Sequence, residues 1–393
     1  MHIDDIRLEI EICGFCPLMC KDICCFHGNA KTEDSAPHIR HLNLWRVMES
    51  MERTEKDSLL KEAAGVIYQC SLCGQCTAWC ARSRDIPTNM MAGRADVVEA
   101  GAAPAGVLDI DKKTEAEHNP YGEPHDKRLS KLDETTGKIL AKRKEGKTGL
   151  WLGCTTAYYQ PEMADALVKI LDAGGVDFQV LNEDEWCCGL PQYKLGLRER
   201  AKDLAGHNVQ ALNKKGFETL VVDCPECYRA FKEFYPAMGH PLGVNIVHSS
   251  EYLRDLINDK KIKPGKKIAK TLTFHDPCEL ARHSTPSVRT RYETSDLFDP
   301  PREVLKSIPG VTLQEMRWVK EKTFCCGGPV GVRELYPEVS FDIGKKVPLE
   351  AAKVGAETLA VACPACKRQF TRVTEGQGNL EVLSIAELVA HSI

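Results

Sequence analysis

The sequence contains two near-copies of a cysteine pair followed by glycine, and this repeat limits what the chain can fold into. The copies read WCCGLP at residues 186–191 and FCCGGP at residues 324–329. Each is preceded by a lone cysteine on an apolar segment and followed, at nearly the same distance, by Cys-Pro-x-Cys. Adjacent core thiols are best explained by a bound metal centre, because metals bind the thiolate. The repeat gives two five-cysteine sets: Cys154, Cys187, Cys188, Cys224 and Cys227, then Cys278, Cys325, Cys326, Cys363 and Cys366.

Residues 149–393 alternate short apolar runs with helical patterns, and the two halves of this region match step by step. The runs lie at 150–152, 176–181, 219–222 and 245–248 in the first half, and at 272–274, 311–313, 358–361 and 380–383 in the second. Such alternation predicts parallel α/β layers. Open parallel sheets bind ligands beyond the carboxyl ends of their strands. The cysteines that follow such runs directly are Cys154, Cys224, Cys278 and Cys363.

Two further cysteine runs lie within residues 1–100. The second of them, CxxCxxCxxxC, has the spacing of a bacterial ferredoxin, in which the fourth cysteine ligates the other cluster. This spacing predicts two cubane [4Fe–4S] clusters, one on Cys13, Cys16, Cys20 and Cys80, the other on Cys24, Cys70, Cys73 and Cys76. Either Cys24 or Cys25 could be the fourth ligand from the first run, and the spacing favours Cys24. We expect Cys25 to be structural or an alternative ligand.

The 19 cysteines of this chain could form disulfides, zinc sites or iron–sulfur clusters. Disulfide scaffolds are usually small and secreted, whereas this chain has 393 residues. Zinc usually takes four ligands in two pairs. Thiolate-only sets with the spacing seen here favour iron–sulfur clusters. Zinc in at least one site is the main alternative.

Composition excludes several classes of function. The net charge of −4 gives no basic excess to neutralise phosphates, so no nucleic-acid partner is expected. No apolar run is long enough for a membrane span, and no signal peptide is visible. Nucleotide-binding glycine motifs and HExxH are missing from the sequence. We expect a cytoplasmic protein, peripheral to the membrane only through a partner.

The expected fold class is α+β and α/β: a ferredoxin-like helical iron–sulfur domain followed by two repeated α/β domains. The expected boundaries are 1–100 for the ferredoxin-like domain, 101–148 for a charged linker, 149–260 for the first repeated domain and 268–393 for the second. The linker is expected because residues 105–147 are rich in charged side chains and interrupted by prolines.

Residues 149–393 resemble the Cys-Cys-Gly (CCG) domain family, typified by the catalytic subunit of heterodisulfide reductase. The motifs that carry the resemblance are WCCGLP with DCPEC, and FCCGGP with HDPCELAR and ACPAC. With its ferredoxin-like front end, the whole chain is similar to the single-chain form of that subunit. Two departures stand out. Glu279 follows HDPC where relatives often have histidine, and the stretch 283–299 is an insertion expected to be a lid or a partner surface.

The resemblance implies that each five-cysteine set binds a non-cubane [4Fe–4S] cluster. The two clusters would face each other across a pseudo-dyad and reduce a disulfide or oxidise thiols. The implied partners are other redox subunits (a flavoprotein, iron–sulfur or cytochrome subunit) and a disulfide or thiol substrate. The alternative is a relay between a flavoprotein and a quinone- or ferredoxin-linked partner, without a small substrate of its own.

Three residues beside the second lone cysteine are the best non-cysteine candidates for catalytic work. His275 and Asp276 are candidates for orienting ligands or delivering protons, because they directly precede Pro277 and Cys278. Arg282 is a candidate for holding an anionic substrate.

Overall fold

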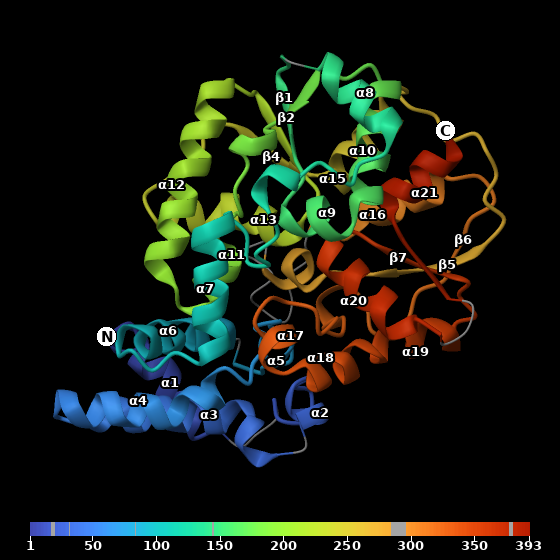
Figure 1. The fold of residues 1–393 in the computed structure, drawn as a ribbon. Helices are drawn as coiled ribbons and strands as arrows, with labels where there is room; N and C mark the ends of the chain where they lie inside the picture. Colours follow the sequence, from blue (N-terminus) through green and yellow to red (C-terminus); the bar gives the residue numbers. More distant parts are fainter. Residues whose placement is uncertain (17–19, 31, 83, 144, 284–295, 377–379) are drawn as a thin grey trace.

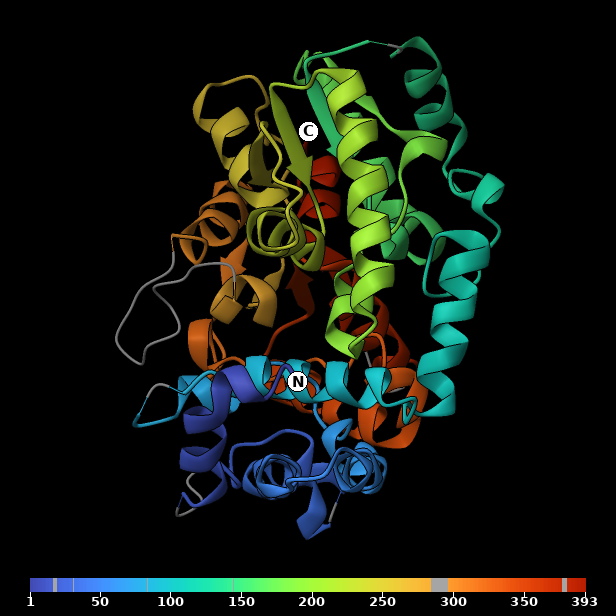
Figure 2. The same cartoon turned by 90° about the vertical axis from the view of Figure 1, so that its left-hand side faces the viewer.

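The computed structural model describes residues 1–16, 20–30, 32–82, 84–143, 145–283, 296–376 and 380–393. The insertion expected to be a lid or partner surface therefore lies largely outside the described residues, at 284–295. Figure 1 shows a helical layer from the N-terminal part of the chain below two units that each contain strands and helices. Figure 2 shows the same layer from the side, below the long helix α12 (Arg198–Lys215).

Two four-stranded parallel sheets confirm the predicted strand–helix alternation. Their strand orders are β2-β1-β3-β4 and β6-β5-β7-β8, which is the same order in both halves. The first sheet consists of β1 (Thr148–Trp151), β2 (Phe178–Val180), β3 (Thr219–Val222) and β4 (Asn245–His248). The second consists of β5 (Thr271–His275), β6 (Thr312–Leu313), β7 (Thr358–Val361) and β8 (Glu381–Ser384).

Each central strand is buried on both faces, as a parallel sheet covered by helices requires. Leu220, Val221 and Val222 of β3 are fully buried, and the same holds for all four residues of β7. In register, Leu150 pairs with Val221, and Phe274 pairs with Ala360. The carboxyl ends of β1 and β3 therefore lie together, as do those of β5 and β7.

The helices that cover the sheets follow the expected patterns. Those of the first half are α9 (Cys154–Tyr159), α10 (Pro161–Ala173), α11 (Leu190–Leu195), α12, α13 (Pro225–Arg229), the π-helix η5 (Ala230–Phe234), α14 (Tyr235–Ala237) and α15 (Ser249–Asn258). Those of the second half are the π-helix η6 (Glu279–His283), α16 (Asp299–Ser307), α17 (Val332–Leu335), α18 (Pro337–Gly344), α19 (Lys346–Lys353), α20 (Pro364–Thr374) and α21 (Ile385–Ser392). Pro161, Pro225 and Pro364 begin their helices, where a missing N–H costs nothing.

The two halves share one hydrophobic core. Helix α10 packs on α21, and α15 packs on α16. Leu167 and Leu253 of the first half belong to the same buried cluster as Phe274, Leu305 and Leu388 of the second. Burial of this apolar surface at about 25 cal/mol per Å² favours a fixed arrangement of the two sheets.

The N-terminal layer is helical. It contains α1 (Arg7–Gly14), α2 (His27–Ala30), α3 (Pro37–Glu49), α4 (Arg53–Ile67), α5 (Gln75–Ala78) and α6 (Ile86–Glu99). Helix α3 packs on α1 and α4, with Leu44 and Val47 fully buried. Short 3₁₀ segments complete the described structure: η1 (Asp4–Ile6), η2 (Glu33–Ser35), η3 (His125–Lys127), η4 (Asn182–Asp184) and η8 (Lys320–Lys322).

The segment expected to be a charged linker contains two helices, α7 (Ala105–Glu117) and α8 (Glu134–Lys142). Val107 and Ile110 are buried on one face of α7. The expectation of a solvated chain missed this face because charged residues separate the few apolar ones. Among the described residues, no helix is long and apolar enough to span a membrane.

Candidate functional site

The first five-cysteine set comes together at the carboxyl edge of its sheet. Cys154 begins α9 directly after β1, and its Sγ lies 4.0 Å from Cys187 Sγ. Hydrogen bonds from Cys187 and Cys227 lower the pKa of Cys188 to about 7. A Cβ added at Gly153 would lie 3.3 Å from Cys227 Sγ, so the lone-cysteine segment passes close to the Cys-Pro-x-Cys segment. Sulfurs from distant parts of the sequence thus form one group.

The second set repeats this arrangement. Hydrogen bonds from Cys325 and Cys366 lower the pKa of Cys326 to about 6. The backbone N–H groups of Gly327 and Gly328 donate to the sulfurs of Cys325 and Cys326 at 3.3 and 3.4 Å. Main-chain donors stabilise thiolate, which is the form that binds metals.

Glycine is required after each cysteine pair by the backbone conformation. Gly189 has φ +79° and Gly327 has φ +77°, values that side chains rarely permit. A Cβ at Gly327 would also overlap the carbonyl oxygen of Ser340, and one at Gly189 would lie 3.0 Å from that of Ala201. The first turn therefore packs closely against α12, and the second against α18.

The two five-cysteine groups are neighbours. A hydrogen bond from Cys227 lowers the pKa of Cys224, but the net effect is a raised pKa. Burial and the charge of Cys363, which belongs to the second group, both raise it. Cys224 and Cys363 end the loops after β3 and β7, the equivalent central strands of the two sheets. The two sheets thus bring their carboxyl edges, and both groups, toward each other.

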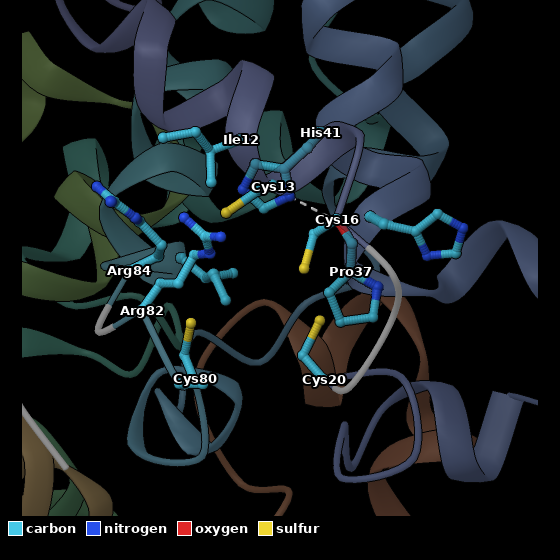
Figure 3. A pocket seen from close by; sticks show the side chains of 12 residues that line it. Ile12, Cys13, Cys16, Cys20, Pro37, His41, Cys80, Arg82 and Arg84 are labelled. Carbon is cyan, nitrogen blue, oxygen red and sulfur yellow. Dashed lines mark hydrogen bonds between the residues drawn. The ribbon is translucent and has the colours of Figure 1, made fainter.

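In the N-terminal layer, one predicted four-cysteine set surrounds a pocket. Cys13, Cys16, Cys20 and Cys80 line a space of about 170 Å³, and Figure 3 shows their sulfurs pointing toward one another. Burial, together with the charges of Cys80 and Cys20, raises the pKa of Cys13 to about 12. The grouping is the one expected when the fourth cysteine of each run ligates the cluster of the other run.

The other predicted four-cysteine set is also assembled. Burial, together with the charges of Cys24, Cys70 and Cys73, raises the pKa of Cys76 well above its usual value. The guanidinium of Arg40, which is 1% exposed, donates to Cys24 Sγ at 3.6 Å. A buried cation is well placed to balance the negative charge of several thiolates.

Cys25 is the cysteine whose surroundings the sequence did not reveal. The sulfurs of Cys25, Cys73 and Cys325 all lie within 4.8 Å of one another, and all three residues are buried. This trio connects a front-end set to the second CCG set. The one signal in the sequence is that Cys25 occupies the place where ferredoxin motifs carry proline.

The three non-cysteine candidates are all buried, and two of them are tied to neighbouring groups by strong hydrogen bonds. His275 is 1% exposed, and burial together with Arg282 lowers its pKa to about 3, so its ring is neutral. Asp276 accepts two hydrogen bonds at 2.8 Å from Arg302. Arg282 donates to the carbonyl oxygens of Cys73, Glu321 and Thr323. These contacts favour positioning roles over contact with a substrate.

The π-helix η6 connects three parts of the molecule. At its C-terminal end, Arg282 binds the Cys73 carbonyl, and His283 Nε2 lies 3.1 Å from the Leu72 carbonyl. At its N-terminal end, Glu279 accepts from Lys194 at 2.5 Å and from Arg229 at 3.1 Å, both in the first half. The segment after Cys278 thus contacts the front end and the first half together.

Glu279 and Lys194 form part of a buried ion network that sequence reasoning missed. Lys194 also donates to Glu226 at 2.5 Å, and Glu226 lies between Cys224 and Cys227. Burial alone would raise the pKa of Glu279, but Lys194 and Arg229 hold it well below its usual range. The departure from histidine at 279 therefore has a local explanation: a carboxylate is needed to pair with two buried cations.

The donor sets fit iron–sulfur clusters in their chemistry. All four groups consist of thiols, and the polar contacts to their sulfurs include the buried cation Arg40 and the backbone N–H groups of Gly327 and Gly328. Iron–sulfur clusters are held by thiolates and are tuned by such hydrogen bonds. Structural zinc takes four ligands, so a five-thiol group fits it less well.

Comparison with known proteins identifies both cysteine-rich halves of the chain. The family model of the CCG cysteine-rich domain matches residues 148–232 and 272–371. One relative is a subunit of dihydromethanophenazine:CoB–CoM heterodisulfide reductase from Methanosarcina acetivorans; it is 34% identical over 342 residues, covering 86% of this chain and 80% of that protein. Another is a subunit of fumarate reductase (CoM/CoB) from Methanothermobacter marburgensis; it is 29% identical over 340 residues, covering 85% of this chain and 64% of that protein.

Two further similarities broaden the comparison. EtfAB:quinone oxidoreductase from Syntrophomonas wolfei is 27% identical over 354 residues, covering 85% of this chain and 48% of that protein. A solved structure of a hypothetical protein from Helicobacter pylori has a TM-score of 0.56 at 10% identity, covering 91% of this chain and 67% of that one, which supports the fold alone. The chain itself belongs to the family of iron–sulfur oxidoreductases with two CCG cysteine-rich domains that includes the heterodisulfide reductase relative from Methanosarcina acetivorans.

Proposed function

We propose that this protein is a heterodisulfide reductase-like oxidoreductase. Electrons pass through two cubane [4Fe–4S] clusters in a ferredoxin-like front end to two non-cubane [4Fe–4S] clusters, where a disulfide is reduced or thiols are oxidised. The observation that supports the proposal is that the CCG-region cysteines form two groups that lie near each other, since the charge of Cys363 in the second group raises the pKa of Cys224 in the first. Two adjacent groups suit a substrate that has two sulfur atoms.

The reaction sets the demands on the protein. Reducing a disulfide takes two electrons and two protons and yields two thiols. When bound, the clusters supply the electron storage and sulfur chemistry, and the protein supplies geometry and access. The backbone donors at Gly327 and Gly328 hold the cysteine pair of the second group. The network of Lys194, Glu226 and Glu279 holds the two groups together.

The ligand sets that we propose are those of the four cysteine groups. One cubane is held by Cys13, Cys16, Cys20 and Cys80, and the other by Cys24, Cys70, Cys73 and Cys76. The first non-cubane cluster is held by Cys154, Cys187, Cys188, Cys224 and Cys227, and the second by Cys278, Cys325, Cys326, Cys363 and Cys366. His275, Asp276 and Arg282 are proposed to position the second set, because they lie beside it and contact its surroundings.

We also propose that a pseudo-dyad relates the two CCG domains, at 149–260 and 268–393, with residues 1–100 as the ferredoxin-like domain and 101–148 as the connecting segment. The contacts between halves support this relation. Helix α10 of the first half meets α21, the last helix of the second, while α15, the last helix of the first half, meets α16. Reciprocal pairing of this kind is what a two-fold axis produces.

The alternative function is an electron relay without a small substrate of its own. It is favoured by the burial of the cysteine sulfurs, since Cys187 is fully buried and Cys363 is 5% exposed. The similarity to EtfAB:quinone oxidoreductase points the same way. Under either function, the partners are other redox subunits, such as a flavoprotein, an iron–sulfur protein or a cytochrome, and the protein acts in the cytoplasm or at the membrane surface through such a partner.

The test is metal analysis combined with EPR on anaerobically purified protein, oxidised with and without an added thiol. We expect about sixteen iron atoms per chain if every four-iron site is filled, and an EPR signal that appears only with thiol. The variants Cys188→Ser and Cys326→Ser should each reduce this signal. About eight iron atoms with zinc in stoichiometric amount would overturn the proposal, and full iron without a thiol-dependent signal would favour the relay.

A further inference from the structure

Cys25 lies in a buried junction between the front end and the second half. Its Sγ is 3.7 Å from Cys73 Sγ, and both are within 4.8 Å of Cys325 Sγ. Cys25 is 3% exposed and Cys325 is 1% exposed. The next residue, Phe26, packs edge-on against Tyr336 of the second half, with ring centroids 5.1 Å apart. The chain at Cys25 is therefore anchored against the second half.

The separation of the Cys25 and Cys73 sulfurs has the size expected of two thiolates that share a metal atom. Two thiolates about 2.3 Å from one tetrahedral ion lie about 3.8 Å apart, which matches the distance between Cys25 and Cys73. The surroundings of this trio are apolar: Phe26, Val332 and Ile343 belong to the same buried cluster. The Ser71 hydroxyl lies 3.3 Å from Cys25 Sγ. Three thiols gathered in such a place are best explained by a metal.

The first half shows how a cysteine pair is arranged without this junction. There, Cys187, the equivalent of Cys325, has the side-chain oxygen of Gln192 at 3.6 Å. Val330 occupies the position of Gln192 in the second half and offers no hydrogen bond. The thiols of Cys25 and Cys73 stand beside Cys325 instead. The trio is thus a specific feature of the second half and not a property of every CCG motif.

We propose that Cys25 is an iron ligand, and that Cys25, Cys73 and Cys325 bridge the second front-end set to the second CCG set through iron and sulfur. This inference rests on the proposed function, because it assumes iron at both sets. It adds a nineteenth ligand to the eighteen cysteines assigned above, and it makes the second CCG group the point where electrons enter from the front end.

The test compares Cys25→Ala and Cys25→Ser with the wild type, each loaded with ⁵⁷Fe and studied anaerobically by metal analysis, Mössbauer spectroscopy and EPR. We expect Cys25→Ala to lose or alter the Mössbauer signal of about one iron atom in roughly sixteen. Cys25→Ser should retain that iron with a changed signal, because a hydroxyl can still bind it. Ser71→Ala is the matched control: it removes the neighbouring hydroxyl and keeps the thiol, so the iron content should stay that of the wild type.

The outcomes separate this proposal from the one on which it rests. Wild-type iron content and spectra in Cys25→Ala and Cys25→Ser would overturn the role of Cys25 and leave the proposed function intact. One zinc per wild-type chain, lost in Cys25→Ala, would also overturn it, because the trio would then hold a separate ion. About eight iron atoms in the wild type would refute the proposed function itself. Near-ultraviolet circular dichroism of the variants shows whether the fold is retained.

Discussion

The two CCG halves have the same strand order but different neighbours, and the contrast is sharpest at their cysteine pairs. Cys187 faces Gln192, whose amide donates to Thr114 of α7 at 2.8 Å. Cys325 faces thiols of the front end. The first half is thus completed by the segment that joins it to the front end, and the second half by the front end itself. Duplicated sheets have acquired different roles through what packs against them.

The two halves also differ at the residue that comes directly after each lone cysteine. Thr155, after Cys154, shares a hydrogen bond of 2.7 Å with the Tyr121 hydroxyl. Glu279, after Cys278, binds Lys194 and Arg229 of the other half. One half makes a neutral local contact where the other makes a charged contact between halves. This difference suggests where the assembly is most easily broken.

Lys194→Met should have the largest effect on stability. It removes the buried cation that Glu226 and the buried Glu279 share, and breaking a buried ion pair costs about 3–5 kcal/mol. We expect a matching fall in the free energy of unfolding, measured by anaerobic urea titration. Lys270→Met, which removes a half-exposed pair with Glu381, is the control and should change little. A small effect of Lys194→Met would mean that the network does not hold the halves together.

Gly327→Ala and Gly189→Ala test whether the two cysteine turns are equally tight. Both residues have positive φ, which costs about 1–2 kcal/mol for alanine. The added Cβ would overlap the Ser340 carbonyl in the first variant but lie 3.0 Å from that of Ala201 in the second. We therefore expect Gly327→Ala to lose more iron and more thermal stability. Equal losses would contradict the difference in packing.

Gln192→Val gives the first half the residue found in the second. The change removes the contacts of the Gln192 amide with Cys187 and Thr114, and a hydrogen bond of this kind contributes about 0.5–1.5 kcal/mol. We expect a lower unfolding midpoint and a shifted EPR signal from the first CCG site, with the second site unchanged. If the first-site signal stays the same, the contact between Cys187 and Gln192 is not part of that site.

His248→Ser tests the smallest contrast, at the last helix of each half. His248 caps α15 and Ser384 caps α21, each with a glutamate three residues later. Burial lowers the pKa of His248 to about 4, against about 6.5 when unfolded. The folded form therefore loses stability as pH falls below 6.5, by about 1.4 kcal/mol at pH 5.5. We expect His248→Ser to lose less stability between pH 7 and 5.5, and equal acid sensitivity would refute the role of His248.

The sequence predicted the parts of the fold that depend on local pattern. Each expected apolar run became a strand, because buried parallel strands read as continuous apolar segments. Cysteine spacing anticipated which sulfurs would gather around the pocket of Figure 3. The buried helix α7 was missed because its apolar residues are sparse among charged ones.

The contacts that hold the site together could not be read from the sequence. Lys194 and Glu279 are 85 positions apart, and Cys25 and Cys73 are 48 apart. Pairing over such distances leaves no periodicity, and a lysine looks the same in a sequence whether it is buried or exposed. Glu279 was visible only as a departure from the family, and its partners explain it.

The helix η6 has a consequence for the time at which the front end matures during synthesis. The loop at Leu72 and Cys73 is made early, but the side chains that hold its carbonyls, Arg282 and His283, lie 209 and 211 residues later. At about 5–20 residues per second, the ribosome needs roughly 10–40 s to supply them. During that interval the loop lacks these contacts, so the front end reaches its final structure only after most of the second half has been made.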